Sequence, residues 1–307
     1  MKKLISITSK DFLSGISPYA SDSRYGLFQT ANGLNPFSNP GTLQPSIAAT
    51  NITGTIVVDQ IQNYVPSVGN LYALGGSGNF YKITDFYATP TVSNLRSGSL
   101  ITATSGISAT AYGLDVFQTK VGATQKSYYW SLGTNSGFIG EYNLSSTWND
   151  TKYTITPAYN SSIYPTLRID DELFFGSKYV VSKLYDDLTN ADPALSENIL
   201  DLPTDHTIVS LETDGTYLVM GATILNKNES KVYFWDYKNR LDSWTVSYSI
   251  KDTLRSLKTI DGVIYAACDR GLWAFNSGTA PVKVRDDIKT ASYNTMVKFN
   301  EGVFLAD

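Results

Sequence analysis

The chain has 307 residues, with 24 lysines and arginines against 28 aspartates and glutamates, so its formal net charge is −4. Charged residues make up 17% of the chain, below the share of about 25% that is usual in soluble proteins. Because no basic face is visible, nucleic-acid binding is not expected. One cysteine and one histidine exclude an intrachain disulfide and metal sites built from several thiolates or histidines. We therefore predict no metal and no cofactor, and, since no run approaches the roughly 18 apolar residues of a membrane helix, no membrane insertion.

The first part of the chain, residues 1–52, differs from the rest. Proline, glycine and asparagine interrupt it too often for a regular strand or helix. Large apolar side chains are nevertheless frequent there, and a soluble linker would not need them. We predict an irregular, extended N-terminal arm that docks onto its own domain or a neighbouring subunit; a disordered tail is the alternative. The side chains expected to make the docking contacts are Tyr19, Tyr25, Leu27, Phe28, Leu34, Phe37 and Leu43.

A hairpin pattern recurs from residue 53 to the end of the chain. The stretch Ile208–Trp235 contains every part of the pattern. Two apolar runs flank the turn signal Asp214-Gly215, and Lys231–Trp235 supplies a third strand. Repeats of about 40 to 50 residues, with about four strands each, are typical of β-propeller blades. An ordinary antiparallel sandwich or barrel is the alternative, but it does not need evenly spaced turns. Equivalent positions are Tyr72, Trp130, Phe175, Val219, Tyr265 and Phe304, at intervals of 58, 45, 44, 46 and 39 residues.

The sequence therefore predicts an all-β fold: a β-propeller of five to six, or seven, four-stranded blades behind the arm. The 21 tyrosines, 13 phenylalanines and 5 tryptophans support strands over helices. Because a ring of blades must not leave an unpaired edge, we expect N-terminal strands such as Thr55–Tyr64 to complete the last blade, or the chain to be part of a longer one. The expected blades cover 53–97, 98–150, 151–203, 204–250 and 251–290, and 291–307 supplies part of another.

Few side chains indicate catalysis. His206 lies in a loop before a strand and no Gly-x-Ser-x-Gly elbow accompanies it, so a Ser-His-Asp triad is not favoured. Paired acids at Asp170-Asp171-Glu172, Asp186-Asp187 and Asp286-Asp287 could serve a glycosidase. Neighbours in a strand face opposite sides, however, and aspartate favours turns. We therefore predict no catalytic residues, and we expect the lone Cys268 to be a small buried residue.

Aromatic side chains are better candidates for binding. Those that we expect to be exposed are Tyr128, Trp148, Tyr237 and Trp244. Such rings stack on sugars or contact other proteins. Since alternate residues of a strand face the core, about half of the aromatic residues in this pattern have a purely structural explanation.

The chain resembles the divergent propeller-like structural proteins of tailed bacterial and archaeal viruses. The resemblance rests on the aromatic, Pro- and Gly-punctuated segment Ile16–Pro45 ahead of degenerate blades such as Leu71–Ile83. Signatures of other propellers are weaker: Trp235-Asp236 resembles the WD40 dipeptide and Gly75-Gly76 the kelch glycines, each in one copy. The Ser-x-Asp-x-Gly-x-Thr-Trp box of sialidases is absent.

This resemblance implies a non-enzymatic component of the virion, at the tail or its portal attachment, made in the host cytoplasm. The propeller is then a rigid protein-interaction platform, and the arm docks to neighbours. Multiple copies in a symmetric assembly with other virion structural proteins are expected. The alternative is a secreted or surface carbohydrate-binding propeller, a lectin or adhesin that works outside the cell on a host-surface glycan. A glycoside hydrolase is the third and weakest interpretation.

Overall fold

The computed structural model describes much of the chain from residue 60 onward and four residue pairs before it. The chain divides into two compact units, Met1–Thr53 and Gly54–Asp307. In the parts described, every regular element is a β-strand, and no helix there is long and apolar enough to cross a membrane. The described residues are 15–16, 27–28, 34–35, 44–45, 60–65, 70–75, 79–84, 91–96, 107–108, 113–133, 137–143, 147–155, 163–239, 242–287, 289–290, 293, 296–299 and 302–305.

The described residues of the first unit form four two-residue strands. These are β1 (Gly15–Ile16), β2 (Leu27–Phe28), β3 (Leu34–Asn35) and β4 (Gln44–Pro45). β1 and β2 pair in parallel, whereas β3 and β4 pair antiparallel. Of the predicted docking residues, Leu27, Phe28 and Leu34 belong to these strands. The others, Tyr19, Tyr25, Phe37 and Leu43, lie outside the described residues, so the docking role of the arm stays a prediction.

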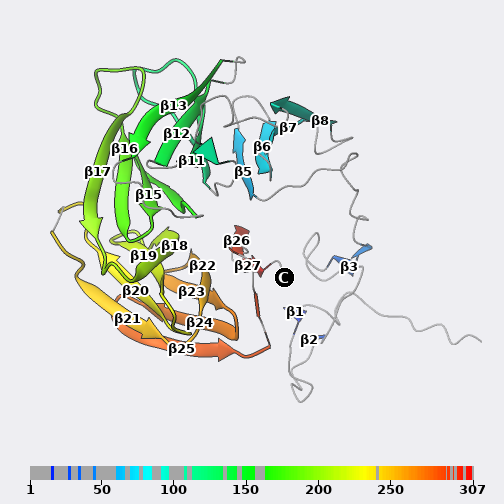
Figure 1. The fold of residues 1–307 in the computed structure, drawn as a ribbon. Coiled ribbons are helices and arrows are strands. Elements are labelled where there is room, and N and C mark those ends of the chain that lie inside the picture. The colour runs from blue at the N-terminus through cyan, green and yellow to red at the C-terminus, as the bar shows by residue number, and fades with distance from the viewer. Residues whose placement is uncertain are drawn as a thin grey trace, which may run out of the picture. The chain divides into compact units, whose positions relative to one another are not determined.

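The second unit consists of antiparallel sheets that follow one another along the chain (Figure 1). Five of them contain four consecutive strands in chain order: β5–β8, β10–β13, β14–β17, β18–β21 and β22–β25. We call these the first to fifth sheets. β9 adds to β11 of the second sheet, and β26–β27 form a two-stranded sheet.

The strands are β5 (Gln60–Val65), β6 (Asn70–Gly75), β7 (Asn79–Thr84), β8 (Thr91–Arg96), β9 (Ile107–Ser108), β10 (Leu114–Phe117), β11 (Lys126–Gly133), β12 (Gly137–Tyr142), β13 (Trp148–Ile155), β14 (Thr166–Ile169), β15 (Glu172–Ser177), β16 (Val180–Tyr185), β17 (Ala194–Asp201), β18 (His206–Thr213), β19 (Leu218–Ile224), β20 (Ser230–Trp235), β21 (Val246–Ile250), β22 (Leu254–Ile260), β23 (Val263–Cys268), β24 (Gly271–Asn276), β25 (Thr279–Arg285), β26 (Met296–Phe299) and β27 (Gly302–Leu305).

Successive sheets pack through their first strands. β5 contacts β10, β10 contacts β14, β14 contacts β18, β18 contacts β22, and β22 contacts β26. Four-stranded antiparallel sheets that follow one another in this way are the blades of a β-propeller, so the predicted fold is confirmed. The positions predicted to be equivalent also agree with the sheets, because Tyr72, Trp130, Phe175, Val219, Tyr265 and Phe304 all lie on the second strand of their sheet.

Two details of the predicted blades are wrong. β13 continues to Ile155, across the boundary expected at residue 150. The sequence placed the boundary too early because the exposed positions of this strand are polar and resemble a loop. The described part of the segment Thr55–Tyr64 does not complete the last blade. This part, from Gln60, belongs to β5, which pairs with β6 in the first sheet. A strand that pairs with its neighbour in the chain closes a short loop, which costs less conformational entropy than pairing with a distant chain end.

Two glycines at matching positions allow successive sheets to approach closely. A Cβ on Gly176 of β15 would lie 2.8 Å from Cγ2 of Ile208 in β18. Gly221 of β19 stands 45 residues later, and a Cβ there would lie 2.2 Å from Cδ2 of Leu254 in β22. The glycine repeat in the sequence thus marks the place where the first strand of the next sheet packs.

The packing requirement at Gly221 predicts a loss of stability in the variant Gly221→Ala. The added methyl group would overlap Leu254, and Leu257 Cδ1 lies only 3.0 Å from the same Cβ position. Overpacking of this kind costs about 1–3 kcal/mol. Gly278→Ala is the matched control, because its nearest atom, Asn276 Oδ1, is 3.6 Å away. Denaturant unfolding of both variants measures the difference, and equal stability of the two would contradict this account of the sheet boundary.

Candidate interaction surface at the boundary of the second and third sheets

The residues considered for nucleophilic catalysis occupy structural positions. His206 is the first residue of β18 and is buried, with Nδ1 2.8 Å from Asp205 Oδ1. Its buried Nε2 has no hydrogen-bond partner among the described residues, so no described serine hydroxyl is positioned against it. The His206 ring instead packs edge-on against Tyr233. Cys268 is buried, as predicted, and burial raises the pKa of its thiol.

The paired acids lie in turns and loops, as their sequence pattern indicates, except Glu172, which begins β15 and binds Lys183. Asp170 and Asp171 form the turn between β14 and β15, and Asp170 has a φ of 52°. Asp186 and Asp187 begin the loop between β16 and β17. Asp287 follows β25 and binds Arg285, which lowers its pKa to about 2. Within the described ranges, no three His, Cys, Asp or Glu residues are grouped so that they could hold a metal ion.

The prediction that four aromatic residues are exposed is wrong for two of them. Tyr128 is 0% exposed and Tyr237 is 7% exposed. Trp148 and Trp244 are half-buried: Trp148 stacks on Tyr142 with ring centroids 4.2 Å apart, and Trp244 packs edge-on against Tyr233 at 4.8 Å. Tyr128 is buried because it lies on β11, an inner strand whose two faces are covered by neighbouring sheets. Trp148 begins the edge strand β13, and Tyr237 and Trp244 lie in the loop between β20 and β21, where each packs against other aromatic rings.

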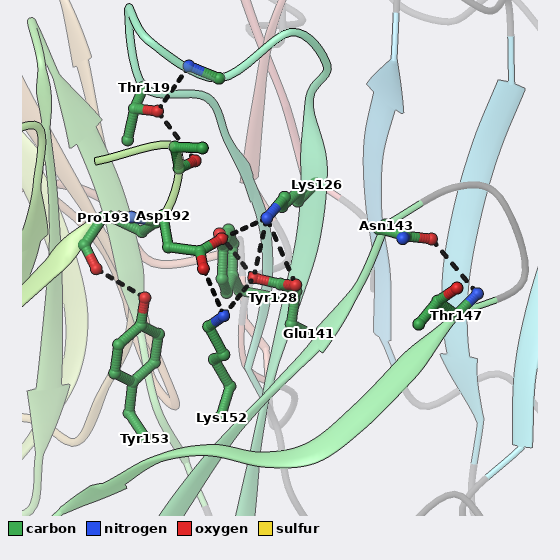
Figure 2. Close-up of polar contacts among 12 residues, drawn as sticks. Thr119, Lys126, Tyr128, Glu141, Asn143, Thr147, Lys152, Tyr153, Asp192 and Pro193 are labelled. Atoms are coloured by element: carbon green, nitrogen blue, oxygen red, sulfur yellow. Dashed lines mark hydrogen bonds and ion pairs between the residues drawn. The ribbon is translucent and has the colours of Figure 1, made fainter. Parts of the chain in front are cut away.

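Four charged side chains instead meet where the second and third sheets adjoin (Figure 2). Lys126, Glu141 and Lys152 come from β11, β12 and β13, and Asp192 comes from the loop between β16 and β17. Lys126 Nζ lies 3.4 Å from Glu141 Oε1, and Lys152 Nζ lies 2.6 Å from Asp192 Oδ2 and 3.7 Å from Glu141 Oε2. Lys126 also binds Asp192. We call this group the charge cluster.

Two tyrosines extend the charge cluster. Tyr128 Oη donates a hydrogen bond to Glu141 Oε2 at 3.2 Å, and Tyr153 Oη donates one to the carbonyl oxygen of Pro193 at 2.6 Å (Figure 2). Burial and the nearby carboxylates raise the pKa of both hydroxyl groups. Both therefore stay protonated and act as donors, and Tyr153 holds the end of the β16–β17 loop against β13.

The charges of the cluster compensate one another. Burial would raise the pKa of Asp192, but its hydrogen bonds from Lys126 and Lys152 outweigh burial and hold that pKa below its usual range. Burial likewise opposes the charge on Lys126, yet Asp192 and Glu141 raise the pKa of the lysine. Two ammonium groups thus face two carboxylates, and the shifts at Lys126 and Asp192 favour the ionised forms of these two residues. The arrangement joins the second and third sheets.

Above the charge cluster, two loops bind each other directly. Residues 118–125 connect β10 to β11, and residues 186–193 connect β16 to β17; we call them the loop pair. Thr119 Oγ1 donates to the carbonyl oxygen of Ala191 at 2.9 Å and accepts from the N–H of Gly122 at 3.0 Å (Figure 2). The Lys120 N–H donates to Asp186 Oδ2 at 2.7 Å. The loop pair is therefore a fixed surface that spans two blades.

Sequence reasoning did not identify the loop pair. Asp186 and Asp187 were recognised only as turn residues, and Thr119, Lys126 and Lys152 carry no motif. The one available signal is the acidic and polar run from Asp186 to Pro193, which is typical of a surface loop but does not indicate what the loop contacts.

Among the comparisons with known proteins, matches come from solved structures, and these matches concern the fold alone. No family model matches the sequence, and no curated protein matches it. Among solved structures, Saccharomyces cerevisiae Sqt1 has a TM-score of 0.53 at 14% identity, with 78% of this chain and 64% of that chain covered. Kuenenia stuttgartiensis hydrazine synthase has a TM-score of 0.52 at 10% identity, covering 81% and 73%. The Cps50 (Swd1) β-propeller domain of Myceliophteria thermophila has a TM-score of 0.43 at 11% identity, covering 74% and 67%.

The match thus spans less than two thirds of the length of Sqt1. At these identities the likeness shows the fold alone, and the class of protein that fold and sheets define is the β-propeller.

Removal of one carboxylate from the charge cluster is predicted to destabilise the protein. Glu141→Gln leaves two lysines facing Asp192 alone in a half-buried site, and we expect a loss of about 1–3 kcal/mol. Asp171→Asn is the matched control, because it breaks an ion pair with Lys120 whose side chains are 61% and 56% exposed. Exposed pairs contribute less than about 1 kcal/mol. Urea unfolding at neutral pH compares the two, and a larger loss in the control would refute the role of the cluster.

The stabilising contribution of Asp192 is predicted to depend on acid pH. Its pKa in the folded protein is below the ordinary value of 3.8, so the contribution is complete above pH 3.8 and is lost as the pH falls through the folded value. The stability difference between the wild type and Asp192→Asn should therefore be constant near neutral pH and shrink in acid. Denaturant unfolding over a series of pH values measures this difference. A difference that grows as the pH falls would show that the sign is wrong.

Proposed function

We propose that this chain is a non-enzymatic platform for protein–protein interaction. The observation that carries the proposal is the loop pair, in which Thr119 and Lys120 of one blade are bonded to Ala191 and Asp186 of the next. A surface that is already ordered loses little conformational entropy when a partner binds. The charge cluster beneath it supports the same role, because its balanced ion pairs stabilise the joint between two blades without a free reactive group.

More specifically, we propose a structural component of a virus particle, at the tail or its portal attachment. The support for this step is the sequence resemblance, that is, an aromatic leading segment ahead of degenerate blades. In such a particle the arm of each copy would dock onto a neighbouring copy, and rotation would repeat the contact in a closed ring.

A carbohydrate-binding function has less support. It depended on exposed aromatic rings, but Tyr128 and Tyr237 are buried, and Trp148 and Trp244 are half-buried among other rings.

The role of the arm predicts a loss of self-association in a variant with Tyr25→Ser, Phe28→Ser and Phe37→Ser. If these side chains dock onto a neighbouring copy, the association constant should fall about tenfold or more. Analytical ultracentrifugation over a range of concentrations measures this constant, and thermal unfolding reports on the propeller, whose melting temperature should not change.

Leu225→Ser is the control for this experiment, because Leu225 lies in the second unit and is 69% exposed. It should leave association unchanged. A wild type that remains monomeric at every concentration, or an arm variant that associates as strongly as the wild type, would refute docking between copies.

A further inference from the structure

The loop pair carries two exposed apolar side chains. Val121 is 51% exposed and Leu188 is 61% exposed. Scattered apolar residues are common on protein surfaces and need no explanation by themselves. These two are not scattered, because one carboxylate holds both loops: Asp186 Oδ2 accepts the N–H of Lys120 at 2.7 Å and Asp186 Oδ1 accepts the N–H of Leu188 at 2.8 Å. Val121 follows Lys120 directly, so both apolar residues flank the same anchor. We call Val121 and Leu188 the apolar pair.

Leu188 is presented in a backbone conformation that leucine disfavours. Its φ is 62°, in the left-handed region. Six described residues other than glycine have a positive φ, and the other five are Asp170, Lys178, Asn198, Asn226 and Asp261. All five have polar side chains, whereas Leu188 combines strain with an exposed apolar side chain. A local arrangement that is unfavourable in both respects indicates a role outside folding.

The neighbouring loop residues hold Leu188 firmly in place. Asp187 Oδ1 accepts the N–H groups of Thr189 and Asn190, each at 2.9 Å, and Asp187 Oδ2 accepts the side-chain amide of Asn190 at 2.7 Å. These hydrogen bonds lower the pKa of Asp187 to about 2, so its carboxylate is charged at every physiological pH. Leu188 is therefore a fixed projection beside a permanent negative charge.

The surroundings of the apolar pair are acidic. The carboxylates of Asp170, Asp171, Asp186 and Asp187 lie in the β14–β15 turn and at the start of the β16–β17 loop. Both segments adjoin the loop 118–125, because the ammonium group of Lys120 pairs with Asp171 and the N–H of Lys120 donates to Asp186. Lys126 and Lys152 do not offset this charge, since Glu141 and Asp192 already neutralise them. The surface thus combines two exposed apolar side chains with four carboxylates, of which Asp171 is paired with Lys120.

We infer that the apolar pair is the docking site for a protein partner that offers an apolar socket bordered by lysine or arginine. This inference deepens the platform function and rests on it. Leu188 fills the socket as an anchor, and Val121 packs beside it, while the polar rim excludes water. The acidic residues select and orient the partner by charge complementarity, which acts mainly on association rate and specificity.

The test uses the full chain and a random library of disulfide-closed peptides displayed on phage. Peptides selected on the wild-type protein should share an apolar residue flanked by lysine or arginine. Synthetic versions of these peptides are then titrated against variants by fluorescence anisotropy. Leu188→Asn should weaken binding about tenfold or more. Asp187→Asn should weaken binding at low salt and flatten its salt dependence, because one rim charge is gone.

Leu188→Asn also separates binding from folding. Asparagine adopts the left-handed conformation more easily than leucine, so the melting temperature of this variant should equal or exceed that of the wild type. Leu225→Asn, at an exposed leucine outside the loop pair, should leave peptide affinity unchanged. Loss of binding together with loss of folding in Leu188→Asn would refute the assignment.

Other outcomes are equally decisive. Selected peptides that are acidic, or that bind Leu188→Asn as tightly as the wild type, overturn the docking site while the platform function stands. Recovery of no binding peptide also overturns it, and the platform is then judged by the association experiment on the arm. Neutral oligosaccharides are titrated in parallel, and sugar binding that depends on Leu188 would replace the protein partner by a glycan.

Discussion

Close packing between each sheet and the first strand of the next is the constraint on which the rest of the molecule depends. A four-stranded blade has no core of its own and buries its faces only against its neighbours. Gly221 therefore stands where Leu254 of the following sheet approaches. Polar groups at these boundaries are satisfied across them, since the N–H of Leu257 donates to Ser210 Oγ at 2.9 Å. Fixing the sheets relative to one another also fixes the loops at their ends.

The sequence allows prediction of features that are local along the chain. Each hairpin combines an apolar strand, a turn and a second strand within a few residues, so its pattern is visible without knowledge of the fold. The turn at Asp261-Gly262 shows this well, because both residues have the positive φ that a tight two-residue hairpin requires. The pairing of β5 was less predictable, because the sequence does not show whether a strand pairs with its neighbour β6 or with the last blade.

The candidate surface depends on contacts that no local pattern reveals. Thr119 and Ala191 are 72 residues apart, and Lys126 and Asp192 are 66 apart. The sequence correctly indicates that Asp186 and Asp187 form a turn, but not that the turn is bonded to the preceding blade. The prediction that Tyr128 is exposed was wrong for a related reason. Alternation along a strand distinguishes two faces, whereas the inner strands of a blade have both faces covered, as the complete burial of Tyr128 shows.

Two sets of charges at the same boundary have different consequences. In the charge cluster, lysines and carboxylates are equal in number and half-buried, so the field that they project into solvent is small and their effect is on stability. At the loop pair, carboxylates outnumber the single Lys120 and are more exposed, so their field extends into solvent over about a Debye length. The balanced set supports the unbalanced set, because Lys126 and Lys152 bind Asp192 and so hold the loop that carries Asp186 and Asp187 against the second sheet. Leu188 then occupies a position where rigidity, exposure and negative charge coincide. It differs in this from Leu225, which is 69% exposed but does not have a positive φ.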